Sequence, residues 1–251
     1  MDAALNALRA SVGRLRATAT ALDDAQLVGA SYCGAWTIAD VLSHLGSGAV
    51  IMQRGLQDAL AGTPTPDGFA QGVWDEWNAK SPRAQADGAL ATDRSLVEAL
   101  EGVRPEDQAT FSFTMGPVTV DFDTFVGMRL NEHVFHTWDV DVALQGTATL
   151  PPDAVPLVVD NLEMMARFTA RPTGETRTIA VRSTDPSRDV TVTLEADAVG
   201  FAAAGSGEPD LVLPAEALCR LVYGRLDPDH TPAFTGDAKA LDALRQVFPG
   251  P

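Results

Sequence analysis

The 251-residue chain lacks the features that mark several classes of protein. Its two cysteines, Cys33 and Cys219, lie far apart without metal-type or redox spacing, so nothing supports a disulfide framework. No apolar run approaches the roughly 20 residues that span a bilayer, and the amino terminus lacks a basic segment followed by an apolar one. We therefore expect a cytoplasmic protein with no membrane partner and with buried or idle thiols.

Basic residues are also scarce. The chain has 18 Lys and Arg against 34 Asp and Glu, which gives a formal net charge of −16. Binding to a nucleic-acid backbone or an anionic membrane surface requires clustered basic side chains that replace counterions. The composition therefore argues against both partners, and it gives no indication of an oligomeric state.

Four segments in the first half of the chain have the apolar spacing of amphipathic helices. The first covers about residues 5–22. The second follows Thr37, whose spacing to Asp40 is that of a capping box. The third and fourth cover about residues 81–100 and 124–144, the third with a proline in its first turn.

The connections between these segments complete the first domain. Residues 62–72 are rich in glycine and proline and predict a long loop, while residues 110–122 predict a short extended excursion or a hairpin around Gly116 and the following proline. Asp121 or Asp123 is expected to cap the fourth helix. Four helices with at least one long connection predict a helical bundle over residues 1–148.

The second half of the chain, residues 149–251, has a mixed pattern after a proline-bearing linker. We expect helices and two strands of period two, joined by a turn-rich crossing at residues 200–210. The expected helices cover residues 155–168, 214–225 and 237–248, and the strands cover residues 176–183 and 189–196. The sequence thus predicts a mainly α, two-domain protein whose smaller second domain is α+β.

Residues 131–140, NEHVFHTWDV, hold two of the four histidines in the chain. On a helix, Glu132, His136 and Asp139 project from one face because they are four and three residues apart, whereas His133 points to a different side. Such a pair offers two of the three protein ligands of an open metal site. His44 is the natural third ligand, because it is the only other histidine before the linker.

Two imidazoles and one carboxylate suit zinc, with nickel, iron or manganese also allowed. The same spacing also occurs on ordinary helix surfaces, where a Glu-His pair makes only a weak interaction. Asp139 is either an acceptor for a ligand imidazole N–H or a solvated helix aspartate. Four tryptophans are interpreted as packing residues: Trp36, Trp74, Trp77 and Trp138.

Two segments resemble the signature helices of a known family. WTIADVLSHL, residues 36–45, and NEHVFHTWDV are similar to segments of the mycothiol-dependent maleylpyruvate isomerase family. Shorter similarities, TMGPVTV, NLEMM, LVYGR and GDAKAL, extend the resemblance over nearly the whole chain. The resemblance implies a DinB-like four-helix bundle followed by a smaller α+β domain.

The same resemblance implies a function. Carried over residue by residue, the family's metal ligands are His44, Glu132 and His136, and its cofactor is mycothiol. An open divalent metal site would hold this thiol as thiolate for addition to a small electrophilic substrate, in an isomerase or a thiol transferase. Two alternatives stay open: a metal-retaining binding or regulatory protein without turnover, and a metal-dependent hydrolase that uses bound water.

Arg225, in the LVYGR segment, is the candidate catalytic residue of the second domain. As a structural residue it would cap helix carbonyls or pair with a carboxylate. As a functional residue it would orient an anionic group, since a chain of charge −16 needs positively charged groups near the site to hold a carboxylate substrate. Arg54 and Arg129 are the arginines closest in sequence to the ligands, and His230 is expected to be exposed and unrelated to the metal.

Overall fold

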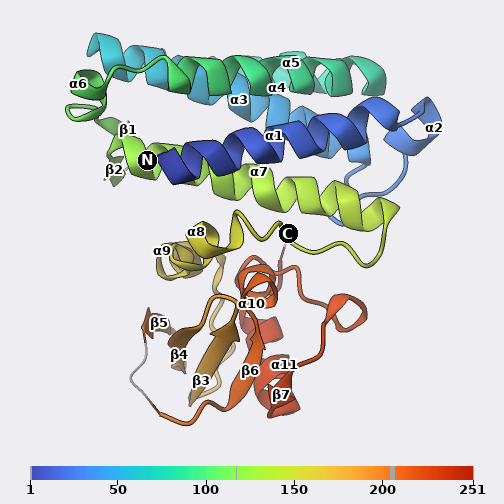
Figure 1. Ribbon diagram of the computed structural model, residues 1–251, viewed down its shortest axis with the longest axis vertical. Coiled ribbons are helices and arrows are strands. Elements are labelled where there is room, and N and C mark those ends of the chain that lie inside the picture. Colours follow the sequence, from blue (N-terminus) through green and yellow to red (C-terminus); the bar gives the residue numbers. More distant parts are fainter. Residues whose placement is uncertain (1, 117, 204–206, 251) are drawn as a thin grey trace. The chain divides into compact units, whose positions relative to one another are not determined.

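The computed structural model describes residues 2–116, 118–203 and 207–250 of the chain (Figure 1). They divide into two compact units, residues 1–148 and 149–251. The first is helical and the second combines helices with a small sheet, so the predicted fold class is confirmed. No described helix has both the length and the apolar character needed to cross a membrane.

Four long helices form the first unit (Figure 1). They are α1 (Asp2–Ala21), α3 (Ile38–Ala61), α5 (Pro82–Glu101) and α7 (Phe122–Leu144). The shorter elements between them are α2 (Asp24–Leu27), α4 (Phe69–Asn78), α6 (Pro105–Gln108) and the hairpin β1 (Phe113–Met115) with β2 (Val118–Val120). All four predicted helices and the hairpin are present, and the proline in the hairpin turn lies outside the described residues.

Local sequence explains where the long helices begin. Thr37 and Asp40 form the predicted capping box at the start of α3. Ser81 caps α5, and the proline that follows occupies the first helical turn. Of the two aspartates considered for α7, Asp121 is the cap, because its side chain accepts a hydrogen bond from the Thr124 N–H at 2.9 Å.

The predicted loop at residues 62–72 is too long at its end, because α4 already begins at Phe69. This helix buries Val73 and Trp77, which lie four residues apart and face the core. The Trp77 ring fills a space beside Gly46 of α3, where an added Cβ would lie 2.2 Å from a ring carbon. The glycine therefore permits a close approach that no larger residue would allow.

The second unit contains a five-stranded sheet in the order β5-β4-β3-β6-β7. All its pairings are antiparallel except that of β3 with β6. The strands are β3 (Arg177–Thr184), β4 (Arg188–Leu194), β5 (Val199–Ala203), β6 (Leu211–Pro214) and β7 (Thr235–Gly236). The helices are α8 (Val155–Val159), α9 (Leu162–Thr169), α10 (Ala215–Val222), η1 (Pro228–His230) and α11 (Ala238–Val247).

Three expectations for this unit need correction. The helix predicted over residues 155–168 is broken at Asp160 and Asn161 into α8 and α9. The segment 200–210 is predicted as a crossing, but its first residues belong to the edge strand β5. This strand contains a glycine and alanines, which have little strand propensity. Residues 204–206 of the segment lie outside the described part of the chain. Strand β6 was missed because four residues joined directly to a helix are too short to show a period.

Candidate metal centre

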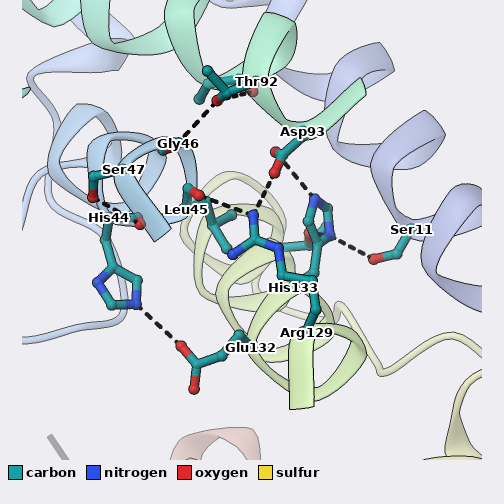
Figure 2. Close-up of polar contacts among 12 residues, drawn as sticks. Ser11, His44, Leu45, Gly46, Ser47, Thr92, Asp93, Arg129, Glu132 and His133 are labelled. Carbon is teal, nitrogen blue, oxygen red and sulfur yellow. Dashed lines mark hydrogen bonds and ion pairs between the residues drawn. The ribbon is translucent and has the colours of Figure 1, made fainter. Parts of the chain in front are cut away.

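Helices α3 and α7 bring the three predicted ligands together. His44 comes from α3, and Glu132 and His136 come from successive turns of α7. Nε2 of His44 lies 3.1 Å from Oε2 of Glu132, and Nε2 of His136 lies 3.7 Å from the same oxygen. One ligand atom from each residue lies within 4.8 Å of the others. Figure 2 shows the His44 ring and the Glu132 carboxylate pointing toward one another.

The cluster is open on one side. The side chains of His44 and Glu132 keep 38% and 46% of their surface exposed, whereas His136 keeps 12%. Burial by itself raises the pKa of the Glu132 carboxyl, but the hydrogen bond with His44 and the charges of His136, His44 and Arg129 outweigh it and lower the pKa to about 2. Glu132 is therefore an ionised oxygen donor at neutral pH.

Asp139 contacts the most buried of the three ligands. Its Oδ2 lies 2.8 Å from Nδ1 of His136, and its side chain is fully buried. The alternative of a solvated helix aspartate is therefore wrong. Because Nδ1 faces Asp139, the other ring nitrogen of His136 is turned toward Glu132, as in metal sites where a carboxylate holds a ligand histidine.

Cys33 lies beside this pair and is buried, as expected for the thiols, but its contact with Asp139 was not predicted. Its Sγ is 2.9 Å from Oδ2 of Asp139 and 4.0 Å from Nδ1 of His136, and the residue is buried. Cys33, His136 and Asp139 thus form a second group of metal-capable side chains that shares His136 with the first. The only local signal was the place of Cys33 just ahead of the ligand-bearing helix.

Trp36 lies beside two of the three candidate ligands. Its ring centroid is 5.3 Å from that of His44 and 6.2 Å from that of His136. The predicted packing role fits Trp77 and Trp138, which are buried, but Trp36 and Trp74 are 39% and 45% exposed. Trp36 therefore borders the site and is not a core residue.

His133 points away from the cluster, as predicted, into a buried polar network (Figure 2). Its Nδ1 lies 2.9 Å from the Ser11 hydroxyl and its Nε2 lies 3.3 Å from Asp93. Asp93 also pairs with Arg129, whose guanidinium donates to the Leu45 carbonyl at 2.8 Å. This network joins α1, α5 and α7 to α3, which it reaches at Leu45, the residue after His44. Arg129, one of the two arginines near the ligands in sequence, is therefore engaged in this network.

The remaining residues singled out from the sequence have partners of their own. Arg54 pairs with Asp58 at 2.8 Å, within α3. In the second unit, Arg225 is buried and its Nη1 donates to the Tyr223 carbonyl at 2.9 Å, a bond that caps the end of α10. His230 is partly exposed and lies 2.8 Å from Asp227. The role of Arg225 toward a substrate stays a prediction.

Comparison with known proteins connects this geometry to a family. The family model described as the mycothiol maleylpyruvate isomerase N-terminal domain matches residues 8–141, which is more than half of the chain and includes all three candidate ligands. The chain belongs to this family. The family predicted from the two signature segments is thus confirmed, while a search of curated proteins gives no match.

Two solved structures are similar to this family member over nearly its full length. They are the mycothiol-dependent maleylpyruvate isomerase and a histidine-to-alanine mutant of the same isomerase, with TM-scores of 0.67 and 0.68. Each comparison covers 94% of this chain and 93% of the other, at 15% sequence identity. At that identity the likeness establishes the fold, and both units of the chain take part in it.

Proposed function

We propose that this family member is a metal-dependent enzyme of the mycothiol-dependent isomerase or S-transferase type. His44, Glu132 and His136 would hold a divalent ion, zinc foremost, with nickel, iron or manganese as other candidates. Mycothiol would be its thiol cofactor, and a small electrophilic molecule, such as an unsaturated carboxylate, its substrate. The observation that carries the proposal is the convergence of three metal-capable side chains from α3 and α7 at an open position.

The donor set fits such an ion. Two imidazole nitrogens and one ionised carboxylate are the ligands of open catalytic sites, which keep further positions free for water or substrate. The three donor atoms already lie within 4.8 Å of one another. A divalent ion at this place supplies the chemistry of lowering a thiol's pKa and keeping it in the thiolate form, which attacks electrophiles.

The chain's own residues prepare this site. The low pKa of Glu132 means that no proton occupies its carboxylate at neutral pH. The contact of His136 Nδ1 with Asp139 leaves the Nε2 lone pair turned to the cluster. Trp36 covers one side with an apolar surface. Cys33 is buried and donates to a carboxylate, an environment that disfavours a thiolate, which supports a reacting thiol supplied from outside the chain.

Metal analysis of protein purified without chelator tests the site. We expect about one divalent ion per chain, and His136→Ala should lose most of it, because two remaining ligands bind far more weakly. His230→Ala is the matched control, since it removes a partly exposed histidine of the second unit. His133 is a poorer control because its removal disturbs the buried network. Full occupancy in His136→Ala would contradict the assignment.

Turnover with mycothiol and a panel of electrophiles tests the activity. An enzyme of this type consumes thiol or substrate over many cycles and needs the added thiol. A binding or regulatory protein would give only stoichiometric association. A hydrolase using metal-bound water would turn over substrate without any thiol, and either result would replace the proposal.

Arg225 is the proposed anion-orienting residue of the second unit. Arg225→Lys should lower activity without loss of metal or fold, because a point charge does not reproduce the bidentate fork of a guanidinium. Arg167→Lys, which changes an exposed arginine paired with Glu163, is the control. Full turnover in Arg225→Lys would leave the residue with its role as a helix-end cap.

A further inference from the structure

We infer that Asp139 and Cys33 are positioning residues of the candidate metal centre. Asp139 fixes the ring of His136 so that Nε2 faces Glu132 and His44, and Cys33 fixes Asp139 by donating its thiol hydrogen to the same carboxylate oxygen. The inference deepens the proposed function and rests on it only where it concerns the metal, because both hydrogen bonds exist within the chain itself.

The Asp139 carboxylate has the position that such a role requires. It stands one turn after His136 on α7, its Oδ2 is 2.8 Å from Nδ1, and its side chain has no exposed surface. A fully buried carboxylate must be satisfied by hydrogen-bond donors, and a ring N–H is such a donor. Donation from Nδ1 sets both the tautomer and the rotation of the ring, and a charged acceptor makes Nε2 a stronger ligand.

Cys33 supplies a second donor to the same oxygen, at 2.9 Å. The main chain of its neighbour Tyr32 also donates to the Asp139 carbonyl, at 3.2 Å. The segment of residues 31–36 is therefore joined to α7 by one main-chain and one side-chain bond at a single residue. Trp36 ends this segment, and its main chain bonds back to Ser31 and to Cys33, while its ring lies beside His44 and His136.

The alternative is that Cys33, His136 and Asp139 themselves bind a metal. The separations of 2.8 Å and 2.9 Å match hydrogen bonds, as does the 3.1 Å between His44 and Glu132, so these distances do not distinguish the two groups. Burial distinguishes them: Cys33 and Asp139 are buried, whereas the cluster with His44 is more exposed and leaves positions for exchangeable ligands.

Nitrogen NMR of the metal-free protein tests the positioning without any metal, at a pH where the imidazole is neutral. We expect His136 in the Nδ1–H tautomer, and a shift of the proton toward Nε2 in Asp139→Ala. Asp141→Ala is the matched control, because Asp141 lies two residues further on α7 and bonds to Thr18 instead. An unchanged tautomer in Asp139→Ala would overturn the role of Asp139. If that variant does not fold, Asp139→Asn is the second variant: its amide N–H can donate to Nδ1, so the proton should move to Nε2, and an unchanged tautomer there would equally overturn the role of Asp139.

Competition with a chelator for zinc measures how much Asp139 and Cys33 contribute to the metal affinity. Asp139→Ala should weaken zinc binding about 10- to 100-fold and Cys33→Ala about 10-fold, the range found when the partners of metal ligands are removed. Cys33→Ser keeps a donor and should bind zinc as the wild type does. Cys219→Ala, which removes the other buried thiol, should change nothing.

Cobalt substitution separates the two roles of Cys33. A positioning thiol gives no thiolate-to-cobalt charge-transfer band, whereas a band that disappears in Cys33→Ser would make Cys33 a ligand and overturn the inference. Wild-type zinc affinity in both Asp139→Ala and Cys33→Ala would also overturn it. A protein with the Nδ1–H tautomer at His136 but without zinc binding would overturn the proposed function and leave the positioning of His136 supported.

Discussion

Removing the charge of Asp93 should destabilise the first unit more than any surface ion-pair change. Asp93 is buried, pairs with Arg129 and contacts His133 (Figure 2). Asp93→Asn keeps the shape and most hydrogen-bonding capacity of the side chain but removes the carboxylate that pairs directly with the buried Arg129 guanidinium. The change therefore isolates the electrostatic contribution.

Breaking a buried ion pair by removing one partner costs about 3–5 kcal/mol. Because the amide oxygen still accepts hydrogen bonds, we expect Asp93→Asn to fall near the lower end, about 3 kcal/mol. A domain is stable by only about 5–15 kcal/mol, so the change removes a large share of the free energy of unfolding. Asp107→Asn, which breaks an exposed pair with Arg104, should cost less than about 1 kcal/mol.

Urea unfolding followed by circular dichroism measures both variants, and the double variant of Asp93→Asn with Arg129→Met completes the comparison. Removing both charges should recover part of the loss, because no unpaired charge then remains buried. A cost below about 1 kcal/mol for Asp93→Asn, equal to that of the surface control, would refute the reasoning.

The same pair predicts a pH dependence. Burial raises the pKa of the Asp93 carboxyl, but the charges of Arg129 and His133 outweigh it and hold the pKa below the ordinary value of 3.8. A group whose folded-state pKa is depressed contributes stability above its unfolded pKa and loses it as pH falls toward the folded value. The difference in stability between wild type and Asp93→Asn should therefore shrink below about pH 4.

Three further outcomes follow from single contacts. Gly46→Ala should destabilise the bundle by about 1–3 kcal/mol in thermal unfolding, because the new methyl group would overlap the Trp77 ring. Thr37→Ala should cost about 1 kcal/mol in the same measurement and Asp40→Ala a comparable amount, since each removes half of the capping box that begins α3. Cys219 should resist alkylation in the folded protein, because complete burial raises the pKa of its thiol, and rapid labelling would contradict this.

The bundle was predictable because its signals are local. Apolar spacing and caps such as Thr37 and Asp121 lie within a few residues of the helices they start, and α3, α5 and α7 begin where those signals stand. The two strands that the sequence did not predict, β5 and β6, share a cause. Strand β6 is four residues long, and β5 is a weakly patterned edge, so each is defined by its neighbours in the sheet and not by its own sequence.

In the candidate site, too, the residues with a local signal could be predicted and the long-range contacts could not. Glu132 and His136 were predictable from helical spacing, and His44 from its place on a second helix together with the family resemblance. The contact of Cys33 with Asp139 joins residues 106 positions apart and shows no pattern along the chain. The partnership of Arg129 with Asp93 likewise depends on how two helices pack, which periodicity alone does not specify.

The place of Trp36 gives this protein a built-in optical probe. Indole emission is quenched by a neighbouring charged imidazole, and the Trp36 ring lies beside both His44 and His136 while remaining 39% exposed. Protonation or coordination of either ring therefore changes the brightness of this one tryptophan. Trp77 and Trp138 are buried and Trp74 is 45% exposed, so comparison with Trp36→Phe assigns the part of the emission change that comes from the cluster, without any attached dye.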